Sequence, residues 1–233
     1  MTTQSRDSLW IEEWLSVERF ATYLHAARGS RELALKLYEW NTRINAELLH
    51  DLAHLEVGLR NHYDKVLKLA TLPHEMHWTE QDSLLSLFPV SIVRNNETGQ
   101  YYDRNKRPRN AIMNAIEKAQ KTSLGKPTPG KIVAEVTFGF WSYLTSAGHE
   151  KNIWTPYLHK AFGQGTIRET IHHVLQDLLN LRNRIAHHEP SLVKPHVISN
   201  KLMYMSAQIL PSNAFRHLQN TSGVLVQLKN RPH

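Results

Sequence analysis

Three side chains that could act on a phosphodiester lie close together in the sequence, at Arg182, Asn183 and His187. On a helix, which turns by about 100° per residue, these three and Ala186 fall within an arc of about 140°. Arginine can hold two phosphate oxygens at once and keeps its charge, and histidine exchanges a proton near neutral pH. Asn183 lies one turn from His187 and could orient its imidazole. This arrangement is suited to chemistry on a phosphodiester.

The same residues also have a plainer interpretation. A helix end favours arginine and histidine because their positive charge complements the helix dipole. An arginine and a histidine at this spacing also occur together by chance. The spacing by itself does not separate a catalytic face from a polar helix end.

The segment that carries this face is predicted to be a helix, which begins at a capping-box pattern over 166–169 and is stopped by Pro190. An apolar stripe on its other side is expected to face the core: Ile167, Ile171, Val174, Leu178, Leu181 and Ile185. Leu175 and Leu179 lie between that stripe and the polar residues. We expect these two leucines to contact a second partner, such as another subunit.

A longer helix, capped by Ser30, is predicted from Arg31 to about Ala70, because its leucines recur with helical spacing and no proline interrupts them. Glu56 and Arg60 lie beside its apolar stripe, one turn apart, where they could form an ion pair. We expect Glu56 to be half-buried, and a half-buried carboxylate normally has a positive partner. A local ion pair with Arg60 and a role at a functional site are both open.

A histidine pair and a basic segment are the other candidate sites. His50 and His54 have a spacing that can bind zinc, but no glutamate between them completes a His-Glu-x-x-His pattern and no third ligand is evident, so we expect no metal. Residues 94–109 place aromatic and basic side chains together, which suits single-stranded RNA, although a solvated loop or hairpin would look the same. The candidate RNA-binding residues there are Tyr101, Arg104, Lys106, Arg107 and Arg109.

Composition limits the class of protein. The chain of 233 residues has a formal net charge of +7 with its histidines neutral, an isoelectric point of about 9.6, and 41% hydrophobic residues. The basic balance favours a polyanionic partner, and the hydrophobic content allows a sizeable core. The absence of cysteine excludes disulfides, thiolate metal sites and a cysteine nucleophile, and it fits a reducing cytosol. We expect a cytoplasmic protein, because neither a secretory signal nor a membrane span is visible.

The chain reads as a single helical domain over residues 1–233, with residues 1–8 disordered and 94–109 forming a basic loop insertion. Its remaining helices are expected at about residues 17–27, 109–122, 132–144, 195–208 and 212–229.

Two strings together carry a family resemblance. Residues 55–61, LEVGLRN, resemble the long-helix motif of the bacterial Abi-like (abortive infection) family, with Gly58 where an alanine is common. Residues 181–190, LRNRIAHHEP, are similar to that family's second motif, the Arg-Asn-x-x-x-His signature of HEPN ribonucleases. Trp40-Asn41, the segment 138–141 and the spacing of these pieces are also similar.

The resemblance implies an all-α, HEPN-like helical bundle with one long central helix and a motif helix. It implies metal-independent RNA cleavage without a cofactor, at a composite site of a homodimer, in phage defence or as a toxin with a protein or RNA antidote. Carried over to this chain, Arg182 and His187 are the catalytic pair, Asn183 the orienting residue and His188 a second candidate. Glu56, Arg60 and Asn61 are supporting residues. The rival hypothesis is a non-catalytic RNA- or protein-binding HEPN module.

Overall fold

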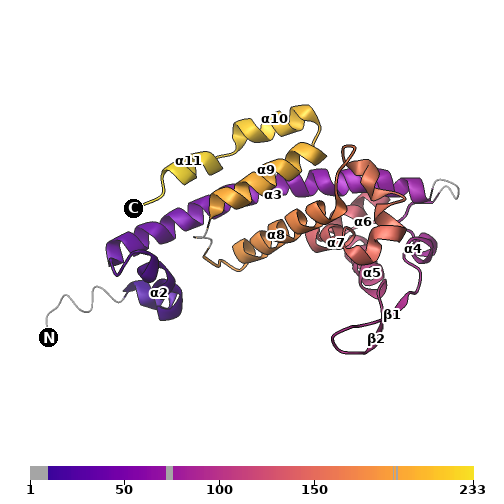
Figure 1. The fold of residues 1–233 in the computed structure, drawn as a ribbon, viewed down its shortest axis with the longest axis horizontal. Coiled ribbons are helices and arrows are strands. Elements are labelled where there is room, and N and C mark those ends of the chain that lie inside the picture. The colour runs from indigo at the N-terminus through magenta and orange to yellow at the C-terminus, as the bar shows by residue number, and fades with distance from the viewer. Residues whose placement is uncertain (1–9, 72–75, 191, 193) are drawn as a thin grey trace.

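The computed structural model describes residues 10–71, 76–190, 192 and 194–233. Its axis is α3 (Arg31–Leu67), a helix of 37 residues. The motif helix α8 (Arg168–Ala186) and the following α9 (Pro195–Ile209) pack along it (Figure 1). The predicted all-α class and long central helix are confirmed. The disorder expected for residues 1–8 concerns residues outside the described part.

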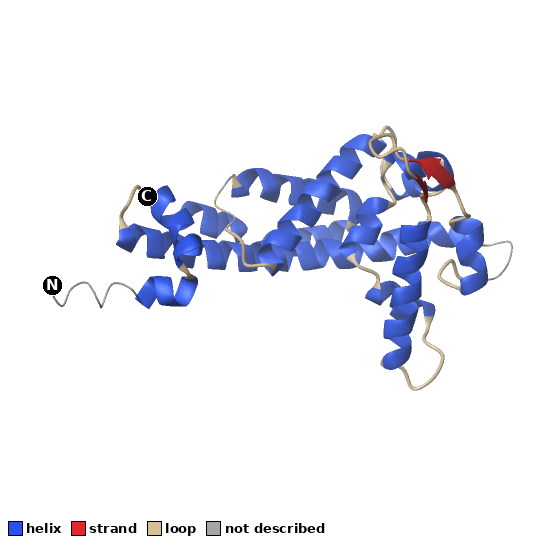
Figure 2. Ribbon diagram, turned by 90° about the horizontal axis from the view of Figure 1, so that it is seen from below, coloured by secondary structure: helices blue, strands red, loops and turns tan. Residues whose placement is uncertain are grey.

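The remaining α-helices and the two strands gather at the ends of α3 or along α9 (Figures 1 and 2). They are α1 (Trp10–Leu15) and α2 (Val17–Ala26) at one end; α4 (Gln81–Leu87), β1 (Ile92–Arg94), β2 (Tyr101–Asp103), α5 (Lys106–Lys121), α6 (Pro129–Glu135) and α7 (Phe138–Tyr143) at the other; and α10 (Ser212–Thr221) and α11 (Val224–Lys229) beside α9. Among the described helices, none combines the length and apolar character needed to cross a membrane.

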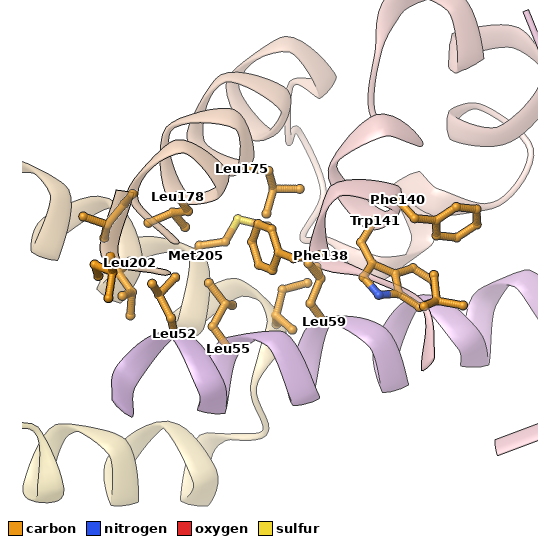
Figure 3. Close-up of a cluster of buried hydrophobic side chains, with 14 of the residues drawn as sticks. Leu52, Leu55, Leu59, Phe138, Phe140, Trp141, Leu175, Leu178, Leu202 and Met205 are labelled. Carbon is orange, nitrogen blue, oxygen red and sulfur yellow. The ribbon is translucent and has the colours of Figure 1, made fainter. Parts of the chain in front are cut away.

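The core forms where α3, α7, α8 and α9 meet (Figure 3). Its members are fully or almost fully buried and come from all four helices: Leu52, Leu55, Leu59, Phe138, Phe140, Trp141, Leu175, Leu178, Leu202 and Met205. Burying a side chain of this size stabilises the fold by about 1.5–3 kcal/mol. This packing holds α8 against α3, α7 and α9.

The predicted role of Leu175 as a subunit contact is wrong, whereas Leu179 is partly buried within its own chain. Leu175 is completely buried in the core of its own chain. Leu179 packs on α7, where its Cδ2 would lie 3.8 Å from a Cβ added to Gly139. The aromatic helix α7 therefore covers part of this strip, at ordinary van der Waals distance.

Two of the predicted helix N-caps are present in the structure, and a third is not. Ser30 caps α3 by accepting a hydrogen bond from the Leu33 amide at 3.3 Å, and Ser16 caps α2. The capping box at the start of α8 is not formed. The Thr166 hydroxyl instead donates to the Gly163 carbonyl at 2.7 Å. The N-cap residue of α8 is Ile167, whose side chain makes no capping hydrogen bond. Ile167 is consequently exposed and does not extend the core stripe.

Two predicted helices are each divided in the structure. The segment 132–144 becomes α6 and α7, because the buried Val136 is extended between them. The segment 212–229 divides at Gly223, whose amide donates to Glu47 Oε2 at 3.0 Å. The preceding Ser222 hydroxyl donates to Asp51 Oδ2 at 2.7 Å. These bonds to α3 replace those that a continuous helix would have made.

The basic segment is a hairpin, which the sequence left open beside a loop, followed by a helix, so residues 94–109 are not one continuous loop. β1 pairs antiparallel with β2, with Val93 opposite Tyr102. The helix α5 then begins at Lys106, earlier than the predicted start at about residue 109. Pro108 lies buried in its first turn, where a proline is tolerated because a backbone N–H there would have no partner within the helix.

His149 generates a prediction about pH. Burial lowers the pKa of His149 to about 4, and the nearby positive charge of Arg104 acts in the same direction. The unfolded chain, with a histidine pKa near about 6.5, therefore takes up the proton first as the pH falls. We expect this histidine to cost about 2 kcal/mol of stability between about pH 7.5 and about pH 5. Urea unfolding at both pH values measures this difference in the free energy of unfolding.

The matched comparison replaces one buried and one exposed histidine. His149→Gln should remove its own share of the loss and leave that of His62 and His172, whose pKa values burial also lowers. His173→Gln should change the loss little, because His173 is 70% exposed. An equal decline in wild type and the His149→Gln variant would contradict this assignment.

Candidate functional site at the end of α8

The C-terminal end of α8 presents the predicted face. Arg182, Asn183 and His187 are exposed there, while Leu181 and Ile185 on the other side are each only 7% exposed. The two-sided geometry predicted from helical spacing is confirmed. The chemical roles of these residues stay predictions.

A specific hydrogen-bonded turn ends α8. The His188 amide donates to the Ile185 carbonyl at 3.0 Å, and the Glu189 amide donates to the Arg184 carbonyl at 2.8 Å. His188 has a φ of 54°, in the left-handed region. Together these features make a Schellman-type C-cap, which satisfies carbonyls that a helix end otherwise leaves unpaired. The helix thus stops before Pro190, and both histidines are carried on a defined turn.

A residue that the sequence analysis missed holds this turn from outside. Arg19 of α2 donates from Nη1 to the His188 carbonyl at 3.1 Å. The two residues are far apart in sequence, and an arginine on a short helix carries no local signal of such a contact. The bond connects the N-terminal helices to the candidate catalytic turn.

The two resemblance motifs meet across α3 and α8. Half-buried Glu56 has a raised pKa because burial disfavours its charge, although the positive charges of Arg182 and Arg60 act against that rise. Arg182 therefore lies close enough to influence Glu56 electrostatically. Although Glu56 and Arg60 are both described, no ion pair within 4.0 Å joins them. Arg60 donates instead to the Ala134 carbonyl at 3.4 Å.

Asn61 is exposed on α3. It lies about 140° around the helix from Glu56, so the structure separates it in direction from the other two supporting residues.

A cleft of about 960 Å³ opens beside the turn. Its walls are the end of α8 and the pair α1–α2, and α3 forms its floor. The lining side chains include aromatic, amide and basic groups: Trp14, Tyr23, Tyr38, Asn41, Asn45, Arg19, Arg182 and His188. Burial raises the pKa of Tyr23 to about 12, so its hydroxyl is a neutral hydrogen-bonding group at physiological pH.

The predicted RNA-binding residues are not brought to this cleft. The hairpin and α5 lie at the end of α3 remote from α2 (Figure 1). Arg109 forms an ion pair with Asp103 and donates to the Phe88 carbonyl at 2.8 Å. Arg104 donates to the Gly148 carbonyl at 3.0 Å. Both arginines therefore contribute to the fold.

The other three candidates of this segment are exposed. Tyr101 is 73% exposed, Lys106 is exposed in the first turn of α5, and the Arg107 guanidinium lies 4.7 Å from the centre of the Tyr143 ring. A cation over an aromatic ring keeps its charge while its orientation is fixed. These three residues remain candidates for RNA contact.

The histidine pair is not part of a larger ligand cluster. His50 Nδ1 lies 2.9 Å from Asp51 Oδ1, and its ring packs against that of His54. Within the described ranges, no group of three or more histidine, aspartate or glutamate side chains could hold a metal ion.

One protein-family model matches most of this chain. The model of the family described as Abi-like protein matches residues 14–191. This chain belongs to the Abi-like protein family. The matched region of this Abi-like protein contains the floor and walls of the cleft and ends just after the α8 turn, so that α9, α10 and α11 lie beyond it. A search of curated proteins and a search of solved structures each found no match.

The basic segment yields a prediction that separates its two kinds of residue. Replacing Lys106 and Arg107 by glutamine should weaken RNA binding and reduce its salt slope by about 0.7 for each lost phosphate contact. Thermal stability should be retained, because both side chains are exposed. Arg109→Gln should instead lower the stability by about 1–3 kcal/mol, since Asp103 loses its half-buried partner.

Fluorescence anisotropy titrations over a salt series measure RNA affinity and its salt slope, and thermal melts measure stability. Lys118→Gln with Lys121→Gln is the matched control, because it removes the same charge from the other end of α5. Equal salt slopes in the two double variants would show that the hairpin end is an ordinary solvated surface.

Proposed function

We propose that this Abi-like protein is a metal-independent endoribonuclease of the HEPN type that acts in abortive infection or as a toxin. One observation carries the proposal: Arg182, Asn183 and His187 are exposed together at a capped helix end, beside a half-buried carboxylate, Glu56. Family membership supports the biological setting. The basic net charge of +7 supports a polyanionic substrate.

The proposed reaction is attack by an RNA 2′-hydroxyl on its own phosphodiester. The bond from the 2′-oxygen to phosphorus forms while the bond to the 5′-oxygen breaks. One imidazole takes the 2′-proton, and a second gives a proton to the departing 5′-oxygen. The products are a 2′,3′-cyclic phosphate and a 5′-hydroxyl end.

Arg182 has the electrostatic role. Its guanidinium can bind two phosphate oxygens and balance the charge that develops on phosphorus. Glu56, held close to Arg182 by the packing of α3 on α8, attracts that guanidinium and so positions it when ionised. In this role Glu56 is a positioning residue, and Glu56→Gln should raise KM for RNA more than it lowers kcat.

One chain offers two imidazoles, which differ in how they are held. His187 is the C-cap of α8, and its amide donates to the Asn183 carbonyl at 3.0 Å. His188 occupies the left-handed position of the turn and lines the cleft. We assign the catalytic role to His187, because it shares the helical face of Arg182. The second imidazole is supplied by His187 of another copy.

The direct test is RNA cleavage in excess EDTA. Wild-type protein should cut RNA but spare DNA, which lacks the 2′-hydroxyl. His187→Ala should reduce the rate by about 10²–10⁴-fold, and Arg182→Ala should lose both cleavage and affinity. His173→Ala, an exposed histidine at the other end of α8, is the matched control. Activity that disappears on chelation and returns with Mg²⁺ would reject the mechanism.

His188→Gly distinguishes the two histidines. Glycine adopts a φ of this sign without strain, so the variant keeps the turn while losing the imidazole. We expect it to remain active. If it is inactive and His187→Ala is active, the roles of the two histidines are exchanged. RNA that is retained in a shift assay but cut under no condition would support the binding-module hypothesis.

The homodimer is part of this proposal and gives its own prediction. The small side chain of Ala186, exposed between Arg182 and His187, leaves room for a second motif helix related by a two-fold axis. Ala186→Glu should give folded, inactive monomers. Ala207→Glu, on the exposed side of α9, should remain dimeric and active. Light scattering beside the cleavage assay decides this, and a fully active wild-type monomer would overturn the composite site.

A further inference from the structure

We infer that the cleft between α1–α2, α3 and α8 seats an unpaired nucleobase beside the phosphate held by Arg182. This inference rests on the proposed function and specifies its substrate as single-stranded RNA. It concerns the side chains on the floor of the cleft, which the proposed chemistry does not use.

The floor carries a buried acceptor without a partner. Asn45 lines the cleft and is 8% exposed, and its Oδ1 has no hydrogen-bond partner among the described residues. An unsatisfied buried carbonyl costs about 1–3 kcal/mol. The oxygen itself is closed to solvent, so a rotation of the Asn45 side chain toward the cleft would let an N–H group of a bound molecule recover that cost.

Nucleobases supply such N–H groups on their base-pairing edges. In a duplex those groups are already bonded to the opposite strand, so a base can offer them to Asn45 only when it is unpaired. The cleft volume of about 960 Å³ lies within the range of about 300–1,000 Å³ typical of ligand sites.

Aromatic side chains stand beside the same floor. Trp14 is 55% exposed, and its ring lies edge-on to that of Tyr38 at 5.3 Å between centroids. Both line the cleft. Stacking of a base on such a ring contributes about 1–3 kcal/mol in single-stranded nucleic acid complexes.

The charges around the cleft suit a phosphate backbone. Arg19 and Arg182 line it on opposite walls, against one acidic lining residue, Glu13. Arg19 also bonds the His188 carbonyl at 3.1 Å, so the wall beside the base is joined to the catalytic turn. A base bound on the floor would therefore set the position of the neighbouring phosphate at Arg182.

The test uses RNA that cannot be cleaved. Short 2′-O-methyl oligonucleotides of each base lack the free 2′-hydroxyl, and anisotropy gives their affinity for the full-length protein. Asn45→Leu, nearly isosteric and without the carbonyl, should weaken binding about tenfold or more and reduce the differences between bases. Its thermal stability should be unchanged or higher, since the unsatisfied acceptor is gone. Asn220→Leu, on exposed α10, is the matched control.

Trp14→Ala is a second variant, which removes an exposed side chain and should likewise weaken binding. Wild-type affinity in both variants would overturn the inference, whether or not the protein cleaves RNA. Loss of dimerisation with RNA affinity unchanged would assign the cleft to a second copy and also overturn it. Weakened binding in a protein that cuts no RNA would keep the inference and reject the proposed activity.

Discussion

The packing of α8 against the apolar stripe of α3 is the constraint on which the rest of the structure depends. Leu178 of α8 and Leu52 and Leu55 of α3 are almost completely buried at this contact. Because the register of the two helices is fixed there, Arg182 is placed near Glu56. The end of α8 then extends past α7, so its polar face is exposed while its apolar face stays buried.

The turn after α8 converts that placement into a defined site. A helix end without a cap would leave carbonyls unpaired and the following histidines mobile. Here the left-handed His188 closes the cap, at the strain that a non-glycine residue has in this conformation. The bond from Arg19 holds the same peptide from the other side. The backbone of both histidines is thereby fixed before any substrate binds, which is what proton transfer requires.

Much of this architecture could be predicted from the sequence, because helical periodicity and capping residues act locally. The extent of α3, its Ser30 cap and the two-sided end of α8 were all predictable on that basis. The predictions that the structure corrects are those that depend on contacts between segments far apart in the chain. The helical pattern alone leaves Leu175 and Leu179 without a partner, because it does not show that α7 packs beside them.

In the candidate site, too, local features were predictable from the sequence and long-range contacts were not. The types and spacing of Arg182, Asn183 and His187 were visible in the sequence, and their shared exposure follows from the helix. Arg19 and Asn45 carry no such signal. Arg19 matters through its bond to the distant His188, and Asn45 through its place in a cleft whose walls come from other helices. In the basic segment, the sequence does not distinguish Arg109 from its exposed basic neighbours. In the structure, Arg109 forms an ion pair with Asp103, which precedes α5.

The most direct test of the central claim is the chemistry of the RNA ends. A synthetic RNA cut by the wild-type protein in EDTA can be examined by mass spectrometry, before any cyclic product is hydrolysed. Attack by the 2′-hydroxyl at the Arg182 and His187 face predicts 2′,3′-cyclic phosphate and 5′-hydroxyl ends. Fragments with 3′-hydroxyl and 5′-phosphate ends would contradict the account, because they arise when water attacks the phosphorus instead.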